Sequence, residues 1–198
     1  MLKQKIAIVG AGIIGQSTAW QLAEQGHEVI LFDPKLDDPI VQEGNLNGSQ
    51  ASLGILMGNI FTKSRGRSWK LRKESMEIWP EWIKSLNKFD HTLRINTPLV
   101  KLAKSKTERL FMEKLQKNKK DIEIEILSQR EKELMLPDFE WGNYGGIISY
   151  KDGRIDAIKL QKCIISALKK NKVKLINNEV ISIKENNSKI TNNWKLIL

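Results

Sequence analysis

A glycine-rich turn close to the N-terminus offers the chemistry of a phosphate-binding loop. Its residues are Gly10, Ala11, Gly12, Ile13, Ile14 and Gly15, which read G-x-G-x-x-G. In such a turn the first glycine permits a tight bend, the second lets a pyrophosphate approach the backbone, and the third lets a helix pack closely on a strand. Asp33 stands where a carboxylate accepts hydrogen bonds from a ribose diol and disfavours a 2′-phosphorylated adenosine. The pattern predicts a dinucleotide site and leaves FAD and NAD both open.

A second stretch of small residues has two hydroxyl groups that could also face a ligand. Its residues are Gly48, Ser49, Gln50, Ala51, Ser52, Leu53 and Gly54. Backbone N–H groups and serine hydroxyls in such a segment can bind a phosphate or a flavin ring. From the residues alone, a flexible turn is an equally good interpretation.

The elements around the glycine-rich turn form a β-α-β unit. An apolar run at 5–9 predicts a strand, helical spacing at 13–25 predicts a helix that ends at Gly26, and residues 29–32 predict a second strand. Such a unit is typical of a parallel sheet with helices packed on it, so the predicted fold class is α/β. Further along the chain we expect helices at 68–86 (kinked or divided at Pro80), 107–118 and 156–171. We expect strands at 93–103 (broken at Pro98), 122–127, 145–150, 173–176, 180–183 and 194–198.

Composition narrows the classes of function. The chain has 198 residues, and its apolar runs are far too short to cross a bilayer, so no transmembrane helix is expected. No signal-peptide pattern precedes the first strand, which predicts a cytoplasmic protein. The net charge of +10 comes mainly from lysines spread along the chain, which favours a solvated surface over a nucleic-acid partner. Cys163, the single cysteine, is expected to be a buried thiol, and His27 and His91 indicate neither a metal site nor a general base.

Three stretches together resemble the D-amino-acid oxidase and glycine oxidase family of FAD-dependent enzymes. The first is the glycine-rich turn continued by residues 16–29, QSTAWQLAEQGHEV, and the second is the segment 49–54. The third runs through Leu134-Met135-Leu136-Pro137, Gly145-Gly146-Ile147-Ile148 and Asp152-Gly153-Arg154-Ile155-Asp156. The resemblance covers essentially the whole chain.

The resemblance implies a Rossmann-type FAD/NAD(P)-binding domain with part of a mixed α+β substrate domain. Residues 1–90 would be the first part of the FAD-binding domain, 91–150 a partial substrate domain, and 151–198 an incomplete return to the FAD-binding domain. Because family members are about twice as long, the chain would be an N-terminal portion, truncated before the residues that hold the substrate.

The same resemblance assigns the cofactor contacts. FAD would lie with its pyrophosphate near Gly10, Gly12 and Gly15 and its adenosine ribose on Asp33. Residues 49–54 would pass the pyrophosphate and the flavin, and Val180 would contact the adenine through its backbone. Lys35 is only an approximate match to a basic residue that the family commonly has after the carboxylate.

The activity implied is oxidation of a small amine or amino acid, glycine or a D-amino acid, to an imine by hydride transfer to the flavin. A glycine oxidase of thiamine biosynthesis and a D-amino-acid dehydrogenase are two versions of it. The short chain alone could be inactive, and a non-catalytic dinucleotide-binding subunit that needs a partner chain, or a homo-oligomer, to complete its sheet is the main alternative. A nucleic-acid binder and an NAD-dependent dehydrogenase also stay open.

Overall fold

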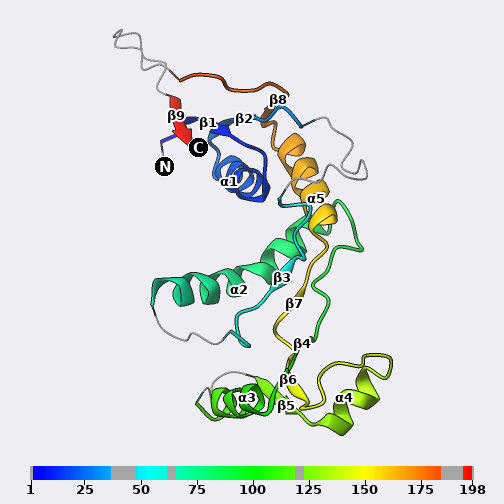
Figure 1. Cartoon of the computed structure of the whole chain (residues 1–198). Helices are drawn as coiled ribbons and strands as arrows, with labels where there is room; N and C mark the ends of the chain where they lie inside the picture. The colour runs from blue at the N-terminus through cyan, green and yellow to red at the C-terminus, as the bar shows by residue number, and fades with distance from the viewer. Residues whose placement is uncertain (1, 37–47, 62–65, 119–122, 184–193, 198) are drawn as a thin grey trace. The chain divides into compact units, whose positions relative to one another are not determined.

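The computed structural model describes residues 2–36, 48–61, 66–118, 123–183 and 194–197. The chain divides into two compact units (Figure 1). Unit 1 comprises residues 1–52, 86–93 and 157–198, and unit 2 comprises residues 53–85 and 94–156. This division differs from the expected boundaries at 90 and 150, because residues 53–85 belong to unit 2 and the chain returns to unit 1 at residue 157.

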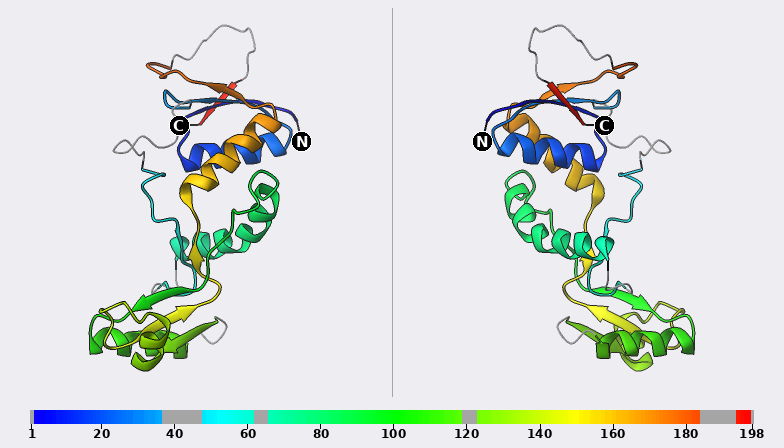
Figure 2. Two further views of the ribbon diagram at one scale, coloured as in Figure 1. Left: turned by 90° about the vertical axis from the view of Figure 1, so that its right-hand side faces the viewer. Right: turned by 90° about the vertical axis from the view of Figure 1, so that its left-hand side faces the viewer.

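Unit 1 is built on a parallel sheet with the strand order β8-β2-β1-β9. The strands are β1 (Lys5–Val9), β2 (Glu28–Phe32), β8 (Lys174–Ile176) and β9 (Trp194–Ile197). Two helices, α1 (Ile13–Glu24) and α5 (Ala157–Lys170), lie side by side on one face of this sheet (Figure 2). The predicted β-α-β unit and the α/β fold class are therefore confirmed.

Alternation along the strands and helical spacing along α5 supply the core of unit 1. Ile6 and Ile8 of β1 are buried, as are Val29 and Leu31 of β2. The buried residues of the two helices are Gln16, Ala19, Trp20, Leu160, Gln161, Cys163, Ile164, Ala167 and Leu168. Burial of each large aliphatic side chain contributes roughly 1.5–3 kcal/mol to the stability of the fold.

Cys163 lies in this core, and its environment predicts a thiol that reacts slowly with labelling reagents. Its side chain is buried, and burial raises the pKa of the thiol, with a further increase from the carboxylate of Asp90. At pH 8 the thiolate, which is the reactive form, is therefore scarcer than for a free cysteine. We expect Ellman's reagent to label the native chain slowly and the chain in denaturant rapidly. Equal labelling rates would contradict this placement.

Unit 2 contains two small antiparallel sheets. Strand β3 (Ile55–Leu56) pairs with β7 (Gly153–Arg154), and the larger sheet has the order β4-β6-β5. The strands of the larger sheet are β4 (Leu99–Leu102), β5 (Ile124–Leu127) and β6 (Gly146–Ser149). The helices are α2 (Arg67–Leu86), of which Leu86 falls in unit 1, α3 (Lys106–Asn118) and α4 (Gln129–Met135). The core of this sheet and α3 consists of Ile60, Ala103, Met112, Leu115, Ile124 and Ile147.

Two local features, the segment 180–183 and helix α4, differ from the sequence predictions. Residues 180–183 do not form a strand, and Ile181 is 88% exposed, because the segment finds no ladder partner among the described residues. Of the two outcomes predicted at Pro80, a kink or a division of the helix, α2 shows no division, since a proline removes one N–H donor while the flanking turns keep theirs. Helix α4 was not expected.

Among the described residues, no helix is long and apolar enough to cross a membrane.

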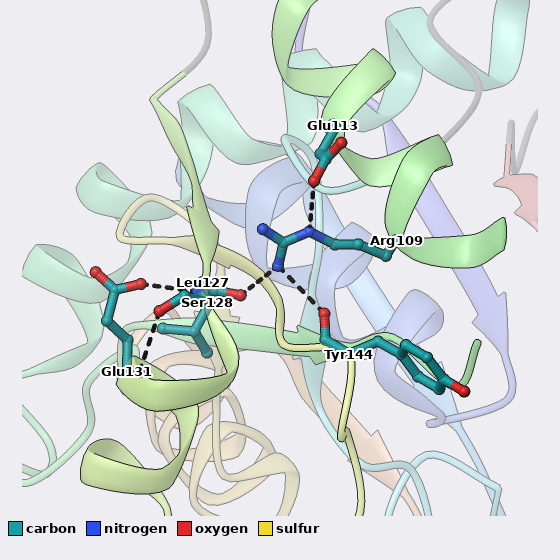
Figure 3. Close-up of polar contacts among 6 residues, drawn as sticks. All are labelled: Arg109, Glu113, Leu127, Ser128, Glu131 and Tyr144. Atoms are coloured by element: carbon teal, nitrogen blue, oxygen red, sulfur yellow. Dashed lines mark hydrogen bonds and ion pairs between the residues drawn. The ribbon is translucent and has the colours of Figure 1, made fainter. Parts of the chain in front are cut away.

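Arg109 of α3 joins three parts of unit 2 (Figure 3). Its Nε lies 2.8 Å from Oε1 of Glu113, and its Nη1 donates to the carbonyl oxygens of Leu127 and Tyr144. The guanidinium group thus links α3 to the end of β5 and to the turn before β6. A Cβ placed on Gly145, which has φ +71°, would collide with the backbone carbonyl oxygen of Leu127, so glycine is needed at this point of the turn.

The prediction for this cluster is that Arg109→Lys destabilises the chain by about 1–3 kcal/mol, because a lysine cannot donate to all three oxygens from one planar group. Urea unfolding monitored by tryptophan fluorescence measures the loss. Arg130→Lys, an exposed arginine on α4, is the matched control and should unfold like the wild type. Identical midpoints for the two variants would contradict the prediction.

Candidate cofactor-binding site

The glycine-rich turn bends at the carboxyl end of β1 and opens α1. Gly10 has φ +97°, a left-handed conformation that favours glycine, and its N–H donates to the carbonyl oxygen of Phe32 at 2.8 Å. A Cβ placed on Gly15 would lie 1.9 Å from the carbonyl oxygen of Gly10. Helix α1 can therefore approach the strand this closely only with glycine at position 15. The turn has the geometry that the sequence pattern predicts.

Asp33, directly after β2, ties two loops together. Its Oδ2 accepts a hydrogen bond from the N–H of Ala11 at 2.7 Å, and its Oδ1 accepts one from the N–H of Lys35 at 2.8 Å. Its own N–H donates to the carbonyl oxygen of Ile176 at 3.1 Å. Because each carboxylate oxygen has a second lone pair, Asp33 can still accept from a diol. The carboxylate therefore stands next to the turn, as the spacing predicts.

Ser49 caps α1 from a distant part of the chain. Gly12 is the N-cap residue of α1 and has no side chain to cap it, but the Oγ of Ser49 accepts a hydrogen bond from the N–H of Ile13 at 3.0 Å. A Cβ placed on Gly12 would lie 3.4 Å from that oxygen, so glycine leaves room for the hydroxyl. Among the described residues, no acceptor engages the N–H of Gly12. That N–H and the helix N-terminus favour an anion at this point.

Ser49→Ala should destabilise unit 1 by about 0.5–2 kcal/mol, because the Ile13 N–H loses its acceptor, as at other helix caps. Thermal unfolding of the purified chain measures this loss. Ser52→Ala is the control, since Ser52 is exposed and only its backbone N–H makes a described hydrogen bond. Equal unfolding temperatures of the two serine variants would mean that the cap contributes nothing to the stability of unit 1.

Gln16 belongs to this site and was missed in the sequence. It is buried in α1, and its Nε2 donates to the carbonyl oxygen of Ala11 at 2.7 Å. Its Oε1 is buried with no hydrogen-bond partner among the described residues. The amide holds the turn from inside the helix. The available signal was a polar residue at an inward position, one turn before Ala19 and Trp20.

The other expected site residues lie in varied surroundings. Ile14 is 81% exposed beside the turn, and Val180 is half-buried in unit 1 after β8. Gln50 is half-buried, and Ala51 and Ser52 are exposed in unit 1. Gly54 belongs to unit 2.

The structure describes both histidines of the chain. His27 accepts a hydrogen bond at Nδ1 from the N–H of Gln4 at 3.2 Å, and His91 is exposed. In the described part of the chain, no three His, Cys, Asp or Glu side chains are placed to hold a metal ion.

The comparison with known families decides what kind of dinucleotide site this is. The family described as FAD dependent oxidoreductase matches residues 5–195. The chain belongs to this family. FAD is the cofactor of the FAD dependent oxidoreductases, and the glycine-rich turn, the open Gly12 N–H and Asp33 fit its dinucleotide portion. The resemblance to the D-amino-acid oxidase family is thereby confirmed.

Solved structures of FAD dependent oxidoreductases share the fold. Glycine oxidase from Geobacillus kaustophilus superposes with a TM-score of 0.75 at 21% identity, over 93% of this chain and 49% of that one. L-alpha-glycerophosphate oxidase from Mycoplasma pneumoniae, solved with FAD bound, gives 0.71 at 23% identity, over 99% and 53%. The chain therefore spans about half the length of these relatives. In sequence, the D-amino acid dehydrogenase of Rhizorhabdus wittichii is 42% identical over 50 residues, which are 25% of this chain and 12% of that protein.

Proposed function

We propose that the chain forms the FAD-binding half of an oxidoreductase that oxidises a small amine or amino acid, glycine or a D-amino acid, to an imine. The proposal is supported mainly by the hydrogen bond from the Ala11 N–H to Asp33, because it holds a carboxylate that could accept from a ribose close to the N-terminus of α1. The substrate class is supported by the names of the similar proteins, a glycine oxidase and a D-amino acid dehydrogenase.

Different residues of this chain would bind different parts of the cofactor. Gly10, Gly12 and Gly15 make room for the pyrophosphate at the start of α1, where the Gly12 N–H can donate to it. Asp33 accepts from the adenosine ribose, and the backbone of Val180 contacts the adenine. Residues 49–52 and Gly54 pass the pyrophosphate and the flavin. FAD, when bound, accepts the hydride from the α-carbon of the substrate.

An absorption spectrum of the purified chain, with and without added FAD, tests the cofactor. We expect bands near roughly 370 and 450 nm that persist through desalting, as a bound flavin requires. A folded chain that retains no FAD but binds NAD would overturn the proposal. Reduction of the bound flavin by glycine and by D-alanine, recorded as the loss of its visible absorbance in the absence of oxygen, then tests the substrate class.

A second candidate is a non-catalytic FAD-binding subunit that functions with a partner chain or a second copy. It is favoured by the half-length match and by exposed apolar side chains in unit 2, among them Leu134 and Trp141. This candidate predicts that FAD binds while no amino acid reduces it. A D-amino-acid dehydrogenase and an oxidase of thiamine biosynthesis are finer versions of the first proposal, and the choice of electron acceptor separates them.

A further inference from the structure

Asp152 is a carboxylate buried in unit 2, and it receives an unusual number of hydrogen bonds. Its side chain has no exposed surface. Oδ1 accepts from the N–H of Gly58 at 2.9 Å and Oδ2 accepts from the N–H of Ile60 at 2.8 Å. The N–H of Asn59 lies 3.0 Å from Oδ1 and 2.9 Å from Oδ2, and the Nδ2 of Asn59 donates to Oδ1 at 3.1 Å. Three successive backbone donors thus converge on one side chain.

This charge is balanced by backbone dipoles. The ion pairs seen among the described residues involve other carboxylates. The N–H of Asp152 donates to the Oγ of the buried Ser149 at 3.1 Å, which fixes the start of the turn. Residues 58–60 lie outside any strand, so without the carboxylate their N–H groups would lack the acceptor that burial demands.

Residues 53 and 54, which precede this segment in the sequence, are also held by residues 152–155. The N–H of Ile155 donates to the carbonyl oxygen of Gly54 at 2.9 Å, and the Nε of Arg154 donates to that of Leu53 at 3.0 Å. Gly54 has φ +63°, and a Cβ placed on it would lie 1.9 Å from the carbonyl oxygen of Ile155. Residues 53–60 are therefore fixed at both ends by residues 152–155, through hydrogen bonds that join positions 92 to 101 residues apart in the sequence.

We infer that Asp152 is a positioning residue for the flavin, acting through Gly54 and the residues that follow it. The inference rests on the proposed function, in which residues 49–54 pass the flavin. Because its side chain is fully buried, Asp152 would act without contacting the cofactor or the substrate itself. It sets the path of the chain that leaves the flavin segment, and a buried charge is suited to this because it accepts from all three N–H groups at once.

The test compares Asp152→Asn with Asp138→Asn in the full chain. Asparagine has nearly the same size but turns an N–H₂ group toward the backbone donors, so one or more of them loses its acceptor. Asp138 is exposed and serves as the control for the same chemical change. We expect Asp152→Asn to weaken FAD binding about tenfold in a fluorescence titration and to alter the visible circular dichroism of the flavin at saturating FAD.

Each outcome decides something. A purely structural role lowers the unfolding temperature but leaves the flavin spectrum and the dissociation constant of FAD unchanged, which would overturn the inference. If Asp152→Asn does not fold, Ser149→Ala replaces it, because that variant removes only the acceptor of the Asp152 N–H; an FAD affinity equal to wild type would again overturn it. A wild-type chain that binds no FAD would remove the proposed function and this inference with it.

Discussion

Gly15→Ala should abolish the retention of FAD and destabilise unit 1 by about 3 kcal/mol, at the upper end for an overpacked interior. The added methyl group would lie 1.9 Å from the carbonyl oxygen of Gly10 and 3.1 Å from its carbonyl carbon. Both are backbone atoms of the turn, so no flexible side chain can yield. Helix α1 must then move away from β1, and the Gly12 N–H moves with it. Urea unfolding and flavin absorbance after desalting measure the two effects.

Gly48→Ala is the matched control for this substitution. A Cβ placed on Gly48 meets nothing within 4 Å among the described residues, and its φ is not in the left-handed region. The control should unfold and bind FAD like the wild type. A Gly15→Ala chain that behaves like the Gly48→Ala chain would show that α1 does not need its close approach to the strand.

Asp33→Asn has the second large effect, a loss of FAD affinity of about 10- to 100-fold. In the wild type, the two oxygens of the Asp33 carboxylate accept from the N–H groups of Ala11 and Lys35. The amide of an asparagine keeps only one acceptor oxygen for these two donors. One donor is left without its partner at a cost of about 1–3 kcal/mol, and the ribose loses a charged acceptor. Isothermal titration of the purified apoprotein with FAD measures the change.

Glu28→Gln provides the comparison for Asp33, since it also replaces a carboxylate by an amide, at an exposed position of β2, the strand that precedes Asp33. Its FAD affinity should equal that of the wild type. An Asp33→Asn chain with unchanged affinity would mean that the carboxylate orders the turn without contacting the ribose. Weakening that is equal in both variants would point to overall charge instead.

The first thirty-three residues could be predicted closely because their pattern is local. The strands at 5–9 and 28–32 alternate in burial, and Gly26, with φ +86°, follows the end of α1. Helix α4 has only seven residues, too few for a periodic pattern of apolar residues to appear. Ser128 and Glu131 form a capping box, which indicates the start of a helix in the sequence. The apolar residues at 180–183 mimic a strand, but a strand also requires a neighbour to pair with.

Within the candidate site, the sequence could predict residues whose role depends on their neighbours in the chain. Gly10, Gly15 and Asp33 are such residues, because one β-α-β unit positions all of them. The cap at Ile13 comes from Ser49, 36 residues away, and only the folded chain reveals the pairing. Asp152 is further still from its donors, 92 to 94 residues, and an isolated aspartate before a glycine reads as an ordinary turn.

The strand order of unit 1 also determines the order in which its strands can pair while the chain is being synthesised. β1 lies between β2 and β9, so one of its edges is paired by residues 28–32 and the other by residues 194–197. During synthesis the first edge can close as soon as the β-α-β unit emerges, while the second must wait until residues 194–197 have left the ribosome. For that interval the apolar strand beneath the nucleotide turn offers a row of open N–H and C=O groups.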